Sequence, residues 1–425
     1  MDASHPLSDQ TPALLTEGYA WLPNRMRRAP GPVLRTRLLG RTAVALRGPE
    51  AVRFFYDEEH VHRHRAVPGP VLSTLFGHGA VHTLDGAEHL ARKELFLPLL
   101  EPRTVAALSE RVGEAWDEAV PEWTKRPRIT LFDEASRVLT RGVHRWAGVP
   151  LDDAEADATA RDMIAMVDGF ATPGPRHWRA RRARARQERR LSSLVREVRA
   201  GTRTAPPGSV LERVAQHRGA TGELLDLHTA AVELLNVLRP TIALSWFLAF
   251  AAHAQHRWPE HRERLRAGGG FAGGPADEAG GADFATAFAH EVRRFYPFVP
   301  FLGGLAAKDM SWHGEDIPAG GLILLDVYGQ HHDTRLWDDP YAFRPERFLG
   351  RTPERDELIP QGGGLPETGH RCPGENIAVG LLETLATRLA LLDCHVPEQN
   401  LSIPLHRVPT GPRSGVLLTV GGAAA

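Results

Sequence analysis

The segment 361–375 restricts the fold of this chain more than any other, because it sets a lone cysteine between a run of glycines and an apolar helix. It consists of Gln-Gly-Gly-Gly-Leu-Pro-Glu-Thr-Gly-His-Arg-Cys-Pro-Gly-Glu. We expect a helix from Pro373 to about residue 392, whose positive end favours the thiolate form of Cys372. Gly374 leaves room for a flat group to approach the backbone. A single thiolate here suits one axial bond to a metal, not a multi-cysteine zinc site.

The composition narrows the functional class. The second cysteine, Cys394, lies in Leu-Leu-Asp-Cys-His without glycines and fits a buried structural thiol. Two cysteines in 425 residues do not make a disulfide framework, and together with a polar stretch at 1–12 they predict a cytoplasmic protein without a signal peptide. The 51 basic and 52 acidic residues give a net charge of -1, which argues against a nucleic-acid partner.

Hydrophobic periodicity predicts a mainly α fold with small β-sheets, in one domain spanning 1–425. Helices are expected at 105–123, 154–170, 178–198, 224–254 and 285–295, with a hairpin at 33–47 and strands near 321–328 and 416–420. The glycine-rich stretch 267–284 predicts a flexible loop, and 421–425 a frayed tail. The apolar run 240–252 is shorter than the roughly 20 residues that a membrane span needs, so we expect a buried core helix.

Three motifs together resemble the cytochrome P450 superfamily of haem-thiolate enzymes. Gly369, Cys372 and Gly374 match its cysteine motif, although His370 stands where arginine is usual and Gln-Gly-Gly-Gly replaces the phenylalanine at the loop start. The resemblance implies the P450 fold. Haem b would lie between a long distal helix and the cysteine-loop helix, with Cys372 as the axial ligand of the iron and His370 in the cofactor site.

The second and third motifs form a predicted ion-pair network. Glu291 and Arg294 are three residues apart on one helix and therefore share a face. Arg347, in the segment 340–348, matches the third member of the family network and would complete a bidentate carboxylate–guanidinium cluster. The alternative is a solvated helix pair, but the phenylalanines that flank both segments favour a buried network.

The pair Arg239-Pro240 interrupts the longest apolar helix. Pro240 removes a helix hydrogen bond and is expected to kink the chain. Arg239 sets a permanent cation among leucines, and burying such a charge unpaired is costly. Neither Glu233 nor Asp226 lies one turn away on the same face, so an anionic ligand is the better partner. The alternative is that Arg239 reaches the surface or pairs with a distant acid.

Arg239-Pro240, together with the glycine-rich cysteine loop, resembles the fatty-acid peroxygenase and decarboxylase branch of the superfamily. In that branch the arginine binds the substrate carboxylate, and hydrogen peroxide replaces dioxygen and a redox partner. We therefore expect a hydrogen-peroxide-dependent enzyme of lipid metabolism that oxidises the α and β carbons of medium- to long-chain fatty acids. Its products would be terminal alkenes or hydroxy acids, with the carboxylate held by Arg239 serving as general acid–base.

The stretch 75–93 carries the remaining polar candidates. Asp85 and Glu88 predict a capping box and a helix that begins at Gly86. One turn along this helix, His89, Arg92 and Lys93 can present donors to one anion, and the resemblance implies that His89 and Lys93 clamp a haem propionate. It also implies that His82 faces the haem edge as a third catalytic residue beside Arg239 and Pro240. A histidine there favours decarboxylation over hydroxylation.

The other candidates leave more than one interpretation open. Four apolar residues match the expected acyl channel but would serve equally as core: Leu72, Phe76, Phe170 and Phe298. The arginine-rich stretch 176–190 either attracts fatty-acid anions or is a solvated helix. A ferredoxin-dependent monooxygenase, a haem lyase or isomerase of lipid hydroperoxides and a non-catalytic haem sensor stay as alternative functions. Arg239-Pro240 argues against the first, and a sensor would need no carboxylate anchor.

Overall fold

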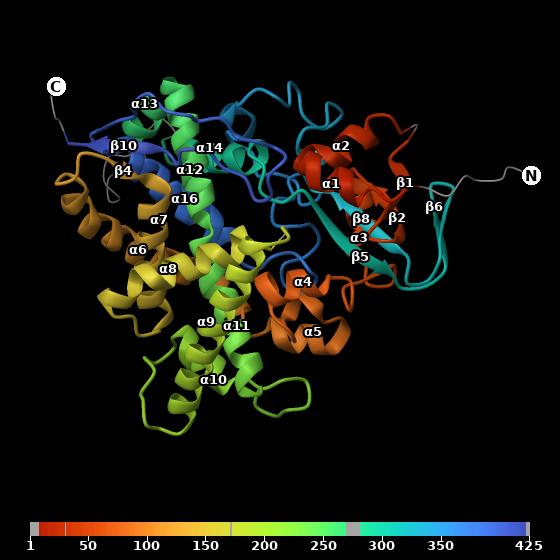
Figure 1. The fold of residues 1–425 in the computed structure, drawn as a ribbon, viewed down its shortest axis with the longest axis horizontal. Coiled ribbons are helices and arrows are strands. Elements are labelled where there is room, and N and C mark those ends of the chain that lie inside the picture. The colour runs from red at the N-terminus through yellow and green to blue at the C-terminus, as the bar shows by residue number, and fades with distance from the viewer. Residues whose placement is uncertain (1–7, 30, 171, 269–280, 422–425) are drawn as a thin grey trace, which may run out of the picture.

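The computed structural model describes residues 8–29, 31–170, 172–268 and 281–421. Within them the chain is mainly helical, as predicted, and its strands form small sheets. Figure 1 shows the N-terminal helices and the largest sheet on one side of the molecule and the long helices on the other.

The helices vary from short connectors to one of 25 residues. They are α1 Thr11–Glu17, α2 Trp21–Met26, α3 Pro49–Tyr56, α4 Gly69–Val71, α5 Gly86–Lys93, α6 Pro102–Trp123, α7 Leu131–Ala147, α8 Asp153–Asp168, α9 Pro175–Arg199, α10 Val210–Gln216, α11 Leu227–Ile242, α12 Leu244–Arg257, α13 Pro259–Gly268, α14 Gly281–Phe295, α15 Val327–His331 and α16 Glu375–Leu391. Single turns lie at Gly18–Ala20, Val81–Thr83, Leu97–Leu100 and Pro345–Phe348, and a π-helix at Leu72–Phe76.

The predicted hairpin is confirmed and belongs to a larger sheet. The strands are β1 Val33–Leu38, β2 Arg41–Leu46, β3 Val61–His62, β4 Ile129–Thr130, β5 Phe301–Ala306, β6 Met310–Trp312, β7 Glu315–Ile317, β8 Leu322–Asp326, β9 Cys394–His395 and β10 Leu417–Val420. The order β1-β2-β8-β5-β3 pairs β2 with β8 in parallel, and all residues of β8 are buried. Gly40 makes the hairpin turn with φ +76°, which favours glycine.

The central apolar segment is a buried core element. The helix pair α11 and α12 spans residues 227–257, and 94% of its most apolar part is buried inside the protein, as expected for a core helix. Pro240 lies inside α11, and the helix breaks only after it: α11 continues to Ile242, and α12 begins after Ala243. α11 packs against α9 and α7.

Three boundaries differ from the predictions. The loop expected at 267–284 is helical at both ends, since α13 reaches Gly268 and α14 begins at Gly281, and residues 269–280 lie outside the described part. The helix after the cysteine begins at Glu375, so the prediction that Pro373 is its first residue is wrong; Gly374 is the N-cap. Most of the expected tail, 422–425, is likewise outside the described residues.

Candidate active site

The cysteine loop is tied to α5 and to its own first residue. The backbone N–H of Cys372 donates to the carbonyl of Gln361 at 3.0 Å. The buried ammonium of Lys93 donates to the carbonyl of Gly369 and, at 3.2 Å, to that of Arg371. Burial raises the pKa of Cys372, and the Gly374 N–H and the charge of Lys93 oppose this only in part. The helix begins three residues after Cys372, and burial outweighs the groups that favour the thiolate.

Arg293 joins the two ends of this loop and was missed by the sequence analysis. It is buried on α14, donates to the Gln361 side chain at 3.1 Å and pairs with Glu375. Arg371 reaches the same carboxylate at 2.5 Å. The sequence feature that could have identified Arg293 is its place between Glu291 and Arg294, the two predicted network residues of the same helix.

The predicted network residues meet in the interior. Glu291 and Arg294 are fully buried and lie 2.7 Å apart, with both carboxylate oxygens engaged. Arg347 approaches the same carboxylate at 3.2 Å. Arg294 also donates to the carbonyls of His331 and Pro340, so it joins α14 to the end of α15 and to the segment that follows it.

Two histidines from distant segments stack beside two acids. The rings of His89 and His370 have centroids 4.0 Å apart. His370 Nε2 lies 3.3 Å from both Glu58 and Asp85, and His89 Nδ1 lies 3.6 Å from Glu58. Burial lowers the pKa of both rings, that of His89 to about 3. Each neutral ring has a single N–H, so a ring that donates it to an acid keeps a lone pair on its other nitrogen; only the protonated ring can donate to the acids and to a further anion.

The acids explain why the capping prediction is wrong. The carboxylate of Asp85 accepts the backbone N–H groups of Arg63 and His64, not those of α5, although the helix does begin at Gly86 as expected. Arg92 also differs from its expected role. Its guanidinium pairs with Glu233 of α11 at 2.7 Å and does not join His89 and Lys93.

Arg239 is buried on α11 without an acidic partner. It is 5% exposed, its Nη2 donates to the Asn236 side chain at 3.3 Å, and its buried Nε has no acceptor. Burial, and next the charge of Arg184, lower its pKa to about 9, whereas Cys372 is close enough to act in the opposite direction. Among the described residues no carboxylate forms an ion pair with it, so the alternatives of a surface position or a distant acid are wrong.

His82 lies within electrostatic range of Arg239. Its ring packs on Phe76 with centroids 4.4 Å apart, and its Nδ1 is buried without a partner. Burial, followed by the charge of Arg239, lowers its pKa to about 3, so the ring is neutral at physiological pH. A neutral ring with an unpartnered nitrogen and a buried cation thus lie within electrostatic range of each other.

Three solved structures resemble this chain over nearly its whole length. Cytochrome P450SP alpha (CYP152B1), in complex with (R)-ibuprophen, is 38% identical with a TM-score of 0.91, covering 97% of this chain and 99% of that one. Ligand-free cytochrome P450 OleT is 35% identical with a TM-score of 0.92, covering 99% of both. Cytochrome P450EX alpha (CYP152N1), with myristic acid, is 34% identical with a TM-score of 0.90, covering 97% and 96%. The family model "Cytochrome P450" also matches residues 277–404.

The chain belongs to the cytochrome P450 family. Its solved neighbours place it in the CYP152 branch, so the predicted fold and branch are confirmed, and the protein is a haem-thiolate oxidoreductase. The non-catalytic sensor is thereby set aside.

A P450 haem fits the residues around Cys372. A Cβ at Gly374 would lie 3.8 Å from the Cys372 sulfur, and the glycine leaves that space open. Lys93, His89 and His370 form a cluster of buried donors, each positioned by the protein. Glu58 and Asp85 lie 3.3 Å from His370, and their negative charges favour the protonated ring, which is the form that can also donate to a further anion.

The predicted channel residues are only partly brought together. Leu72 and Phe76 lie half-buried on the π-helix, and Phe76 packs on His82. Phe298 packs on Phe247 of α12 with centroids 4.7 Å apart, and Phe170 follows α8 and is half-buried. The structure therefore brings Phe76 into direct contact with His82 and leaves Leu72, Phe170 and Phe298 as predictions.

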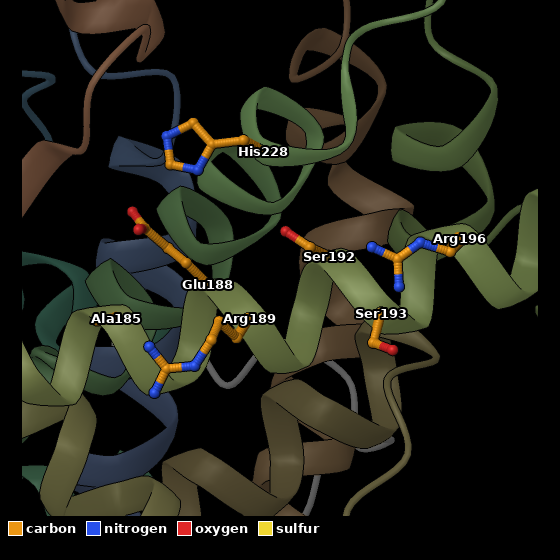
Figure 2. Close-up of a pocket in the computed structure, with 7 residues that line it drawn as sticks. All are labelled: Ala185, Glu188, Arg189, Ser192, Ser193, Arg196 and His228. Carbon is orange, nitrogen blue, oxygen red and sulfur yellow. The ribbon is translucent and has the colours of Figure 1, made fainter.

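The arginine-rich helix α9 divides its side chains between two environments. Arg184 turns inward, is 2% exposed and donates to the carbonyls of Leu75 and Phe76 at 2.7 and 3.0 Å. The outer face bears a hollow of about 430 Å³, shown in Figure 2. It is lined by Ala185, Glu188, Arg189, Ser192, Ser193 and Arg196 of α9 and by His228 at the start of α11. None of the predicted site residues lines this hollow.

Proposed function

We propose that this P450 is a hydrogen-peroxide-dependent fatty-acid peroxygenase in which Arg239 binds the substrate carboxylate. The observation that carries the proposal is a buried guanidinium with an unpartnered Nε and no carboxylate partner in the described structure. A carboxylate satisfies both the charge and the donors of such a group. The presence of myristic acid in the P450EX alpha structure supports a fatty acid as the source of that carboxylate.

Haem b is the proposed cofactor, with Cys372 as its iron ligand and His89, Lys93 and His370 at its propionates. When bound, the thiolate-ligated iron supplies the oxidising chemistry. Arg92 is left out of this set, since its charge is already paired with Glu233.

The chain's own residues position the substrate and its proton carrier. Arg239 fixes the carboxylate, which takes a proton from one oxygen of the peroxide and returns it to the departing oxygen. Pro240 excludes a backbone donor at this turn, and neutral His82 borders the acid's α and β carbons. Leu72, Phe76, Phe170 and Phe298 line the acyl chain. Oxidation there yields a terminal alkene by decarboxylation or a hydroxy acid by hydroxylation.

The same arrangement makes an electron-delivering partner unnecessary, because peroxide brings both oxygen and oxidising equivalents. We therefore propose that the enzyme works on fatty acids without a redox partner. We also propose that it is cytoplasmic. The buried, unpartnered guanidinium of Arg239 argues against the ferredoxin-dependent monooxygenase.

Arg239→Ala in the haem-loaded protein tests the proposal. Fatty-acid binding, followed by the ferric absorption spectrum, should weaken, and turnover with hydrogen peroxide alone should fall by roughly a hundredfold or more, because the variant loses both the anchor and the proton carrier. Arg128→Ala, an exposed arginine just before β4 and away from α9 in the sequence, is the control and should leave both unchanged. Wild-type activity in Arg239→Ala would reject the proposal.

A further inference from the structure

A chain of hydrogen bonds runs along one face of α11 and ends at Arg239. Glu233, Asn236 and Arg239 are spaced three residues apart. The Asn236 Nδ2 donates to Glu233 Oε2 at 3.1 Å, and its Oδ1 accepts from Arg239 Nη2 at 3.3 Å. Glu233 is thus connected to the anchor through one amide, although the two charged groups lie too far apart in sequence to pair directly on the helix.

Glu233 also holds two other parts of the site. It is 0% exposed, and its Oε1 accepts the backbone N–H of Val81 at 2.8 Å and the Arg92 guanidinium at 2.7 Å. Val81 directly precedes His82, and Arg92 lies on the helix that carries His89 and Lys93. One carboxylate therefore links the distal helix, the His82 turn and α5.

Along this hydrogen-bonded face of α11 the charge of Arg239 is not compensated. Arg92 neutralises Glu233, and Asn236 is neutral, so the charge of Arg239 stays available for a ligand. A carboxylate at 236 would cancel it. The neutral amide of Asn236 therefore orients the Arg239 guanidinium without placing a negative charge beside it.

The identity of Glu233 decides which end of Asn236 faces the anchor. A carboxylate can only accept hydrogen bonds, so the NH₂ group of Asn236 must face it and the carbonyl oxygen must face Arg239. A flipped amide would set two donors against the guanidinium and leave an acceptor against an acceptor. With the native orientation, Nη2 is held toward Asn236 and the remaining donors of Arg239 are free for a carboxylate.

We propose that Glu233 is a positioning residue of the fatty-acid site: through the amide of Asn236 it orients the Arg239 guanidinium, and through Val81 it fixes the turn that carries His82. This inference rests on the proposed function, in which Arg239 binds a carboxylate. It assigns to Glu233 no contact with substrate or cofactor.

Glu233→Gln in the haem-loaded protein is the direct test, because it keeps the shape and adds a donor toward Asn236. The amide of Asn236 then turns its NH₂ toward Arg239. Affinity for a fatty acid, measured by the ferric absorption change, should fall roughly tenfold, as expected when a hydrogen bond to a charged group is lost. Binding of the fatty-acid methyl ester, which lacks the charged head, should not change. Equal weakening for acid and ester would show general loosening and overturn the proposal.

Two further variants make each outcome decisive. Asn236→Ala removes the bridge and should weaken acid binding alone; combined with Glu233→Gln it should cost no more than by itself, since both act on one contact. Additive losses would show that Glu233 does not act through Asn236 and would overturn the proposal. If Glu233→Gln fails to fold, Asn236→Ala alone decides: unchanged fatty-acid binding in that variant would overturn the proposal. Glu134→Gln, another buried glutamate with three donors, on α7, is the matched control and should bind normally.

The same measurements separate the two proposals. If Arg239→Ala binds fatty acids normally, the proposed function fails. If Arg239→Ala loses binding while Glu233→Gln and Asn236→Ala keep it, only the positioning role fails.

Discussion

Arg239 keeps its charge at a place where both burial and a second buried guanidinium oppose it. These two influences lower its pKa to about 9. The group is therefore still charged at neutral pH, and a bound carboxylate would relieve the unfavourable electrostatics. The folded chain is stabilised by whatever anion it binds there, by mass action. At the scale of one residue, the site is complete only when a ligand supplies the missing negative charge.

A prediction at the scale of one residue concerns His82. Its low pKa, caused mainly by burial, makes the ring neutral, so His82→Gln changes shape and the position of the polar atom without changing charge. We expect products to shift from terminal alkene toward hydroxy acid, with fatty-acid affinity nearly unchanged. Mass spectrometry of the products made with hydrogen peroxide measures the ratio. An unaltered ratio would remove His82 from the catalytic set.

At the scale of elements, α9 holds the π-helix Leu72–Phe76 through one buried side chain. Arg184 donates to the carbonyls that end this helix, where a cation is favourable. The approach requires glycine at 77: a Cβ there would lie 2.1 Å from Arg184 Nη2, and the backbone has φ +91°. Phe76 in turn contacts His82. By holding the end of the π-helix, Arg184 therefore also holds the residue on which His82 packs.

Gly77→Ala should therefore strain the backbone and also break the hydrogen bonds of Arg184. The alanine pushes Arg184 off the two carbonyls, and we expect a loss of about 2–4 kcal/mol in unfolding free energy, from backbone strain plus hydrogen bonds to a charged group. Fatty-acid affinity should fall with it. Gly174→Ala is the control, because Gly174 has φ +87° but nothing within 4 Å of the added carbon. Equal losses of stability in chemical denaturation of the two variants would contradict the role of Arg184.

How much the sequence predicted also differs by element. The hairpin, the long helices and the buried apolar segment followed from periodicity, because each depends on local pattern and burial. The start of α16 and the break after Ile242 were missed by two or three residues, since Gly374 and Pro240 act on the turns beyond them. The parallel pairing of β2 with β8 joins segments far apart in the chain and leaves no local signal.

The candidate site shows the same division. The sequence could predict that Cys372 and Arg239 need partners, because a lone thiol in a glycine-rich loop and a lone charge in an apolar helix do; their roles toward haem and fatty acid stay proposals. The bridge through Asn236 could not, since it depends on which way an amide turns. The acids behind His370 come from segments near residues 58 and 85, and only the folded chain brings them together.

At the scale of the whole molecule, charge is balanced overall but not on α9. The chain has a net charge of -1, yet within the described structure Arg181, Arg182, Arg189 and Arg196 have no carboxylate in ion-pair contact. Arg189 and Arg196 line the surface hollow of Figure 2. The inner side of the same helix contacts the π-helix beside the distal site. A fatty-acid anion approaching this side of the protein therefore meets a positive field.

Reversing part of this field should slow the arrival of charged substrate. We expect Arg181→Glu/Arg182→Glu to lower the association rate of a fatty acid roughly threefold to tenfold at low salt, with the difference fading as ionic strength rises, because exposed charges act through a field that salt screens. Stopped-flow absorption of the ferric haem gives the rate. The dissociation rate should stay constant, since neither arginine touches the bound carboxylate in the proposed site.

The methyl ester serves as the control ligand: having no charge, it should associate equally with both proteins at every salt concentration. A rate for the acid that is unchanged in the variant, or a loss that persists undiminished at high salt, would show that α9 is a solvated helix without a part in substrate capture.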